Sequence, residues 1–169
     1  PAQVSATADG QYPKAVILSC IDSRVPVEYV FDQGVGDIFT ARVAGNFVNE
    51  DILGSMEFGA KVAGSRLIMV LGHESCGAVK SAIDDVRVGN ITPMLEKIQP
   101  AVRASEGFKG EKSTKNADYV AHVCENNVML TIENIRERSP ILKEMEENGE
   151  IMIVGAVYDL DTGEVELLD

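Results

Sequence analysis

The fold is decided by two short apolar stretches, AVILSC at residues 15–20 and RLIMVL at residues 66–71. Continuous apolar runs of this length are typical of β-strands that are covered on both faces. GDIFTAR at 36–42 and EIMIVGAVY at 150–158 predict two further strands, and DLDTGEVELL at 159–168 predicts a turn and a short edge strand. The sequence therefore predicts a sheet of four to five strands.

Helices are predicted between these strands. Over residues 46–63, apolar residues recur at steps of three and four, as they do on one face of an amphipathic helix. Further helices are expected over 76–87, 91–105 and 118–138, and Ser139–Pro140 opens one that ends near Gly149. Strands that alternate with helices indicate an α/β fold whose sheet is mostly parallel, with right-handed crossovers.

The chain has the length and composition of one domain. Its 169 residues are 45% hydrophobic, which is enough for a sizeable core, and no repeat or linker divides them. We expect a single domain over residues 1–169, in which 1–13 form a loose polar leader. No apolar run approaches the roughly 20 residues that a transmembrane helix needs, so we expect no membrane partner.

The charge balance argues against nucleic-acid binding. Fifteen Lys and Arg against 27 Asp and Glu give a net charge of −12, and no basic cluster is present to neutralise phosphates. An anionic membrane surface would repel the chain for the same reason. The three cysteines form an odd set, which does not indicate a disulfide framework.

Polar residues follow two of the predicted strands. Cys20 ends the first strand and precedes Asp22 and Arg24, while His73 and Cys76 follow the strand at 66–71. Ligand sites in parallel sheets lie outside the carboxyl ends of the strands. Zn²⁺ binds thiolate and imidazole, and a catalytic zinc site keeps three protein ligands and one open position. Cys20, His73 and Cys76 are therefore candidate zinc ligands.

Two plainer interpretations stay open at this stage. A buried cysteine is usually a small core residue, although one of only two histidines here lies three residues before one of only three cysteines. Asp22 and Arg24 could form a surface ion pair that contributes little. Beside a metal, the arginine would instead keep the carboxylate ionised, and the carboxylate would orient a bound water.

CIDSRVP at 20–26 and GHESCGAV at 72–79 together resemble the β-class carbonic anhydrases, whose pattern is Cys-x-Asp-Ser-Arg followed by His-x-x-Cys. The resemblance is to a bacterial-type sequence of the plant-like, non-allosteric branch. It implies the fold of that class, zinc on Cys20, His73 and Cys76, an Asp22–Arg24 dyad, and interconversion of CO₂ and bicarbonate. The similarity extends over ARVAGNF at 41–47, ENIRERSPIL at 133–142 and VGAVYDLDTGEV at 154–165.

The resemblance also assigns substrate-binding positions. Gln11 matches a glutamine that hydrogen-bonds substrate in the plant-like branch, and Phe39 and Ala44 match an aromatic and a small aliphatic pocket residue. Phe58 stands where that branch has a tyrosine, so any role of that hydroxyl is lost. Ile17 stands where the bicarbonate-regulated branch has a tryptophan, which argues against that type of regulation.

The mechanism implied is attack by hydroxide on CO₂. Zinc lowers the pKa of bound water to roughly 7, and CO₂ would lie against Val25, Phe39 and Phe58 while Gln11 donates to a substrate oxygen. His122 lies in a predicted helix and is interpreted as a surface residue rather than a proton shuttle. Cys124, in the same helix, is interpreted as a helix residue rather than a ligand.

Two other functions remain possible on the same residues. The zinc site could hydrolyse carbonyl sulfide or carbon disulfide, because pocket width decides between these substrates. Alternatively, the chain could be an inactive, zinc-stabilised interaction protein. A purely structural zinc site would not need the Asp22–Arg24 dyad, so the sequence favours the enzyme.

The resemblance implies a homodimer or a dimer-based tetramer. The family usually has one or two N-terminal helices that wrap a partner subunit, whereas nineteen residues precede Cys20 here, so we expect these arm helices to be absent. We expect a cytoplasmic protein, since zinc thiolates persist in a reducing compartment. The alternative is a periplasmic protein whose signal peptide has been removed.

Overall fold

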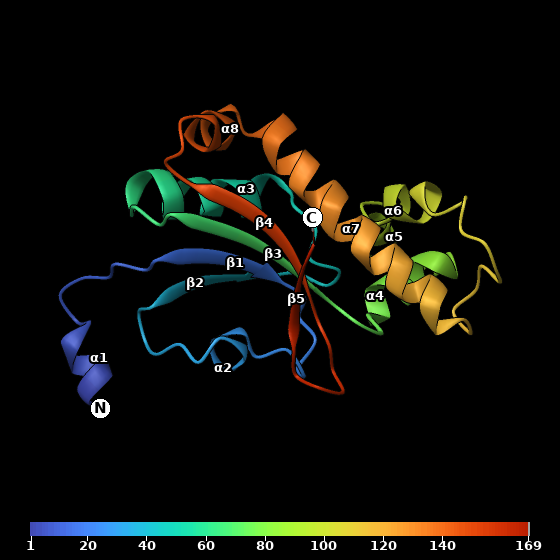
Figure 1. Ribbon diagram of the computed structural model, residues 1–169, viewed down its shortest axis with the longest axis horizontal. Coiled ribbons are helices and arrows are strands. Elements are labelled where there is room, and N and C mark those ends of the chain that lie inside the picture. Colours follow the sequence, from blue (N-terminus) through green and yellow to red (C-terminus); the bar gives the residue numbers. More distant parts are fainter. Residues whose placement is uncertain (169) are drawn as a thin grey trace.

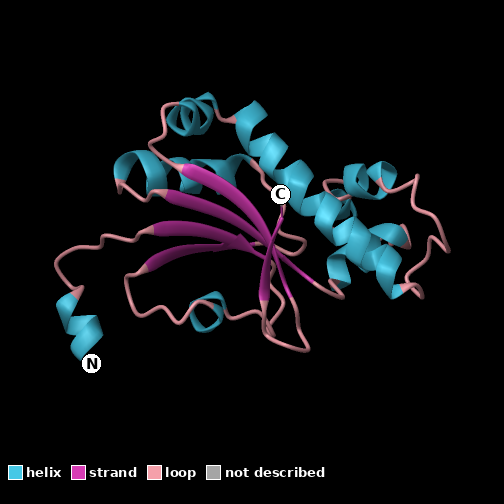
Figure 2. Cartoon of the chain, in the orientation of Figure 1, coloured by secondary structure: helices cyan, strands magenta, loops and turns pink. Residues whose placement is uncertain are grey.

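A computed structural model describes residues 1–168 and contains one five-stranded sheet with helices on both sides (Figures 1 and 2). The order of the strands in the sheet is β2-β1-β3-β4-β5. The first four strands are parallel to their neighbours, and β5 runs antiparallel to β4 at the edge. The predicted, mostly parallel α/β fold is confirmed. The strands are β1 (Ala15–Ser19), β2 (Ile38–Arg42), β3 (Leu67–His73), β4 (Met152–Tyr158) and β5 (Val165–Leu168).

The helices agree with the sequence in position and differ in length. The predicted helix over 91–105 is two short helices, because Pro100 lacks an N–H group and its ring would clash with the carbonyl of Glu96 in a continuous helix. The helix expected over 46–63 begins after Asn49, whose side chain accepts a hydrogen bond from the N–H of Ile52 at 2.9 Å. Its last turn is π-helical, over residues 58–62.

Two helices were not expected from the sequence. Residues 2–6 of the leader are helical and exposed, and residues 27–30 form one turn after the first strand. Ser139 caps the last helix as predicted, with its Oγ accepting from the N–H of Leu142 at 3.2 Å. The helices are α1 (Ala2–Ala6), α2 (Val27–Val30), α3 (Glu50–Glu57), the π-helix η1 (Phe58–Val62), α4 (Gly77–Ile83), α5 (Ile91–Leu95), α6 (Gln99–Ala104), α7 (Ala117–Arg138) and α8 (Pro140–Glu147).

The two faces of the sheet carry separate cores. Alternate residues of a strand point to opposite faces, so Val16 and Leu18 of β1 belong to the core under α3, α7 and α8 (Figure 1). Ile17 belongs to the smaller core on the opposite face, where Val25 and Val27 cover the sheet. The long helix α7 thus lies over the middle of one face, and a single turn, α2, lies over the other (Figure 1).

Two glycines bring α7 close to the sheet. A Cβ atom on Gly72 would lie 2.7 Å from Val128 Cγ2, and one on Gly155 would lie 2.8 Å from Val128 Cγ1. The helix therefore rests directly on the backbone of β3 and β4. A third apolar cluster fills the space beyond the carboxyl ends of the strands, where Val79 of α4 and Val123 of α7 pack around Cys20 and Cys76. Within residues 1–168, no helix is both long and apolar enough to cross a membrane.

Candidate metal centre

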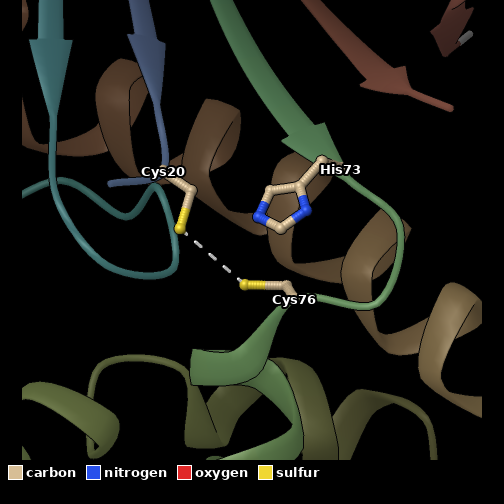
Figure 3. A group of neighbouring side chains, drawn as sticks. All are labelled: Cys20, His73 and Cys76. Carbon is tan, nitrogen blue, oxygen red and sulfur yellow. Dashed lines mark hydrogen bonds between the residues drawn. The ribbon is translucent and has the colours of Figure 1, made fainter. Parts of the chain in front are cut away.

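Three potential metal ligands converge at the carboxyl end of the sheet (Figure 3). Cys20 follows β1 directly, His73 is the last residue of β3, and Cys76 precedes α4. The sulfur atoms of Cys20 and Cys76 lie 4.0 Å apart, and all three ligand atoms lie within 4.8 Å of one another. The three residues are at most 4% exposed. Such a cluster can hold a metal ion through two sulfurs and one nitrogen.

The local backbone explains why these side chains meet. Ser19 of β1 is paired with Leu71 of β3 in parallel register, so both strands end at the same edge of the sheet. After β3 the chain reverses through Ser75, whose φ of +50° lies in the left-handed region that L-residues seldom occupy. This turn directs Cys76 back toward Cys20. Backbone strain of this kind is found chiefly at functional sites.

His73 is held in the tautomer that a metal requires. A carbonyl oxygen only accepts, so the Nδ1–H donates to that of Glu74 at 2.7 Å, and in the neutral ring this leaves the lone pair on Nε2. Nε2 is buried and has no hydrogen-bond partner among the described residues. Buried polar atoms are nearly always hydrogen-bonded. The unshared lone pair of Nε2 therefore fits a metal ion in the triangle of ligand atoms.

The two sulfurs are chemically unequal. A hydrogen bond from Cys76 lowers the pKa of the Cys20 thiol to about 4. The same bond, together with burial, raises the pKa of Cys76. The N–H of Gly45 also points at Cys20 Sγ, at 3.4 Å. The two sulfurs thus share a proton between them, and binding of a metal ion to both sulfurs releases it.

Asp22 and Arg24 form a bidentate ion pair beside this cluster. Arg24 donates to Asp22 Oδ1 from Nε at 2.9 Å and to Oδ2 from Nη2 at 2.7 Å. These charge-assisted bonds hold the pKa of the Asp22 carboxyl well below its usual range. Oδ2 also lies 3.7 Å from His73 Nε2. The structure therefore places an ionised carboxylate at the edge of the ligand triangle.

Sequence reasoning missed two residues that contact this site. Arg42, at the end of β2, donates to the carbonyl oxygen of Cys20 at 2.8 Å and to that of Asp22 at 2.6 Å. Asn127 of α7 donates to the carbonyl oxygen of Gly45 at 2.7 Å. Contacts to main-chain oxygens leave no motif in a sequence. One signal could have indicated Arg42: it is the last residue of β2, and β2 ends beside the end of β1, where Cys20 follows.

The remaining candidate pocket residues do not all lie beside the ligands. Val25 is fully buried in the core under α2, and Ala44 adjoins Gly45 and is half-buried. Phe39 and Phe58 pack edge to face, with ring centroids 6.5 Å apart. They line an open groove of about 790 Å³ between β2 and α3.

Phe39 is paired with a residue four positions before Cys20, so roughly 13 Å of strand separates it from the ligands. Gln11 is exposed and lines a depression with Val35 and Gly36. One chain therefore assembles Cys20, His73, Cys76, Asp22 and Arg24, whereas it holds Gln11, Phe39 and Phe58 apart from them.

The second histidine and the third cysteine lie on α7. His122 is half-buried rather than on the surface: its ring packs on Phe108 at a centroid distance of 5.3 Å, and Nε2 lies 3.3 Å from Asn126 Nδ2. Cys124 is 3% exposed, and burial raises its pKa to about 12. As expected from the sequence, Cys124 is a packed helix residue outside the ligand triangle.

Comparison with known proteins identifies the family of this chain. The carbonic anhydrase family model matches residues 15–165. Carbonic anhydrase 2 of Mycobacterium tuberculosis is 38% identical over 167 residues, which cover 96% of this chain and 77% of that protein. The carbonic anhydrase of Mycolicibacterium smegmatis is 38% identical over 168 residues, covering 96% and 78% of the two chains.

Solved structures show the same architecture. The β-carbonic anhydrase CafA of Aspergillus fumigatus superposes with a TM-score of 0.87 at 25% identity, over 100% of this chain and 81% of that one. The family model covers most of the chain, and the two bacterial relatives, each 38% identical to it, are named carbonic anhydrases. The chain therefore belongs to the β class of the carbonic anhydrase family.

Proposed function

We propose that this chain catalyses the reversible hydration of CO₂ to bicarbonate and a proton, at a zinc ion held by Cys20, His73 and Cys76. The observation that carries the proposal is the buried, unpartnered Nε2 of His73 within reach of two cysteine sulfurs. Three protein ligands leave the fourth position of a tetrahedral site for a water molecule. When bound, zinc supplies an acidified water whose pKa is roughly 7, so that a nucleophile is available at neutral pH.

The donor set favours zinc over Mg²⁺ and Ca²⁺. Thiolate and imidazole are ligands for Zn²⁺ and for copper, whereas Mg²⁺ and Ca²⁺ prefer carboxylate and carbonyl oxygens. The sulfurs of Cys20 and Cys76 are buried, so few water molecules compete for the ion. His73 needs no rearrangement to serve as a ligand, because its tautomer is already fixed by Glu74.

Asp22 orients the nucleophile in this proposal. An ionised carboxylate only accepts hydrogen bonds, and Arg24 keeps Asp22 ionised through both of its oxygens. Asp22 would therefore accept a hydrogen bond from a nucleophile that still carries a hydrogen. This bond would orient the nucleophile so that an oxygen lone pair faces CO₂. The guanidinium also competes for the carboxylate, and so restrains it from moving onto the metal.

The proposal includes a homodimer that pairs along β2. This strand lies at the edge of the sheet, so its outer backbone groups are available to another strand. The groove beside it exposes aromatic side chains, with Phe58 52% exposed. Gln11, Phe39 and Phe58 lie apart from the ligands of their own chain, and we assign their substrate-binding role to the site of the partner copy. Sedimentation that shows only monomer with full activity would contradict this assignment.

The test joins metal analysis with kinetics. We expect one zinc per chain and stopped-flow hydration of CO₂ by the purified protein. Hydrolysis of carbonyl sulfide and of carbon disulfide is measured in parallel. If the protein hydrolyses one of them and does not hydrate CO₂, that sulfur compound is the substrate instead. Full zinc occupancy without any of these activities would leave the interaction-protein alternative, and protein that binds no zinc would overturn the proposal.

A further inference from the structure

Cys20 is held from two sides by residues whose side chains form no hydrogen bond with His73 or Cys76 within residues 1–168. On the sheet side, Arg42 occupies the last position of β2, paired with Ser19 at the end of β1. Its guanidinium reaches past the end of the sheet and donates from Nε to the carbonyl oxygen of Cys20 and from Nη2 to that of Asp22. These two bonds, at 2.8 and 2.6 Å, close the turn that carries both Cys20 and Asp22.

A guanidinium suits this position for a geometric reason. Its nitrogens lie in one rigid plane, so two carbonyl oxygens bound to it are fixed relative to each other. The main chain that carries the Cys20 sulfur and the Asp22 carboxylate is thus restrained by one side chain from the neighbouring strand. A lysine would bring the charge but present a single nitrogen, and could satisfy both oxygens only with poorer geometry.

On the helix side, Asn127 is linked to the sulfur through Gly45. Asn127 of α7 is 3% exposed and donates to the carbonyl oxygen of Gly45 at 2.7 Å, while the N–H of Gly45 points at Cys20 Sγ at 3.4 Å. Gly45 has φ of +84°, and a Cβ atom there would lie 2.4 Å from Ile98 Cδ1. Glycine suits this position, and Asn127 holds the carbonyl of Gly45, on the far side of its Cα from the N–H that points at the sulfur.

We propose that Arg42 and Asn127 are positioning residues of the metal centre: Arg42 fixes the main chain of the Cys20–Asp22 turn, and Asn127 anchors Gly45, whose N–H donates to the Cys20 sulfur. The inference rests on the proposed zinc site and extends it beyond the three ligands and the dyad. Hydrogen-bond partners that orient metal ligands typically change metal affinity or activity by about 10–100-fold when removed.

The experiment measures zinc affinity by competition with a chromophoric chelator in the full chain. Arg42→Met keeps the length of the side chain and removes both donors, and Arg42→Lys keeps the charge. Arg66→Met is the matched control, because Arg66 is an exposed arginine at the opposite end of the sheet, just before β3. Asn127→Leu is compared with Asn134→Leu, two turns further along the same helix.

We expect Arg42→Met and Asn127→Leu to weaken zinc binding by about 10–100-fold, with both controls close to wild type and Arg42→Lys between Arg42→Met and wild type. Cobalt substitution provides a second readout, since displaced sulfurs should alter the thiolate-to-cobalt absorption bands. Thermal unfolding of the zinc-free proteins reports any purely structural effect. If Arg42→Met does not fold, Arg42→Lys is measured in the same way and carries the test for that residue.

Wild-type affinity and an unchanged cobalt spectrum in a variant, even with reduced thermal stability, would show that its residue serves only folding, and would overturn the proposal for that residue. Equal losses in the controls would overturn it for both. Wild-type protein that binds no zinc is a separate result, because it refutes the proposed function itself.

Discussion

Two groups of potential metal ligands lie side by side at the same edge of the sheet. His73 belongs to the first, with Cys20 and Cys76, and the next residue, Glu74, belongs to the second, with Asp159 and Asp161. The first group is buried, whereas the second is half-buried to exposed. Judged by the spacing of their ligand atoms alone, both groups are candidate metal sites.

The hydrogen bonds separate the two groups. Asp159 Oδ1 accepts from the N–H of Asp161 at 2.7 Å and from that of Thr162 at 2.9 Å, so this carboxylate already holds the turn before β5. In contrast, His73 Nε2 is buried and lacks a partner among residues 1–168. A buried polar atom left unpaired is costly, whereas an exposed carboxylate is satisfied by water. Burial without hydrogen-bond satisfaction, rather than proximity of ligand atoms, is therefore what sets the first group apart from the second.

The largest effect that would test this contrast is removal of a ligand. We expect Cys76→Ala to abolish stoichiometric zinc and to lower CO₂ hydration by about three orders of magnitude or more, because the metal contributes several kcal/mol to the reaction. Zinc analysis and stopped-flow kinetics measure both quantities. Asp161→Ala is the matched control from the second group and should keep its zinc. Loss of zinc in the control would join the two groups into one site.

The next effect concerns the carboxylate beside the ligands. We expect Asp22→Asn to retain zinc and to lower kcat by about 10–100-fold, because the amide is neutral and no longer only accepts hydrogen bonds. The variant keeps the size of the side chain, so its zinc content serves as the internal control. Equal rates in wild type and variant would remove the proposed role of the dyad, and zinc loss would show that Asp22 acts on binding instead.

The sequence predicted those parts of the fold and site that depend on residue type and local spacing. The apolar runs of β1 and β3, the Ser139–Pro140 helix start and the two polar segments after the strands are all visible in the printed residues. The structure brings the Cys20 and His73–Cys76 segments together because β1 and β3 are adjacent and end at one edge. Parallel topology predicts this edge, so the candidate ligands could be proposed without coordinates.

The parts that sequence reasoning missed depend on long-range contacts. Arg42 bonds carbonyl oxygens of the turn after β1, and any residue in place of Cys20 would offer the same oxygen. α2 is a single turn without a helical repeat of its own. The resemblance to the family assigns Phe39 and Phe58 to the pocket. An alignment identifies a residue's position along the chain, and it does not say which copy of the chain that residue faces.

A third effect uses Cys124, the cysteine that is buried without being a candidate ligand. Burial raises its pKa from 9.0 to about 12, so the folded chain keeps the thiol neutral where the unfolded chain would lose its proton. The stability that this group confers is complete below pH 9 and is lost as the pH rises toward 12. The loss is about 1.4 kcal/mol per pH unit within that window.

We therefore expect urea unfolding of the zinc-free protein to show a shallower alkaline loss of stability in Cys124→Ala than in wild type. The variant starts lower because a small cavity replaces the thiol, and the two curves should converge as the pH rises above 9. Parallel curves would mean that Cys124 ionises as easily in the folded chain as in the unfolded one. Zinc content should be the same in both proteins, which separates this buried cysteine from Cys20 and Cys76.

The smallest effect concerns Asp159, in the second group, and the contribution of its charge to stability. Hydrogen bonds from the N–H groups of Thr162 and Asp161 lower the pKa of Asp159 below 3.8 in the folded chain. The stability conferred by its charge is thus present above pH 3.8 and is lost as the pH falls through the lower, folded-state pKa. Asp159→Asn keeps the accepting oxygen and removes the charge.

The wild type should therefore be slightly more stable than Asp159→Asn near neutral pH, and this difference should shrink as the solution is acidified. Urea midpoints of the zinc-free proteins between pH 7 and pH 3 measure it, and the zinc content of both proteins at pH 7 is the control. A difference that does not change with pH would assign the effect to geometry rather than charge. Loss of zinc in Asp159→Asn would contradict the separation of the two groups. A carboxylate that only holds a turn should not influence an ion bound by buried sulfur and imidazole.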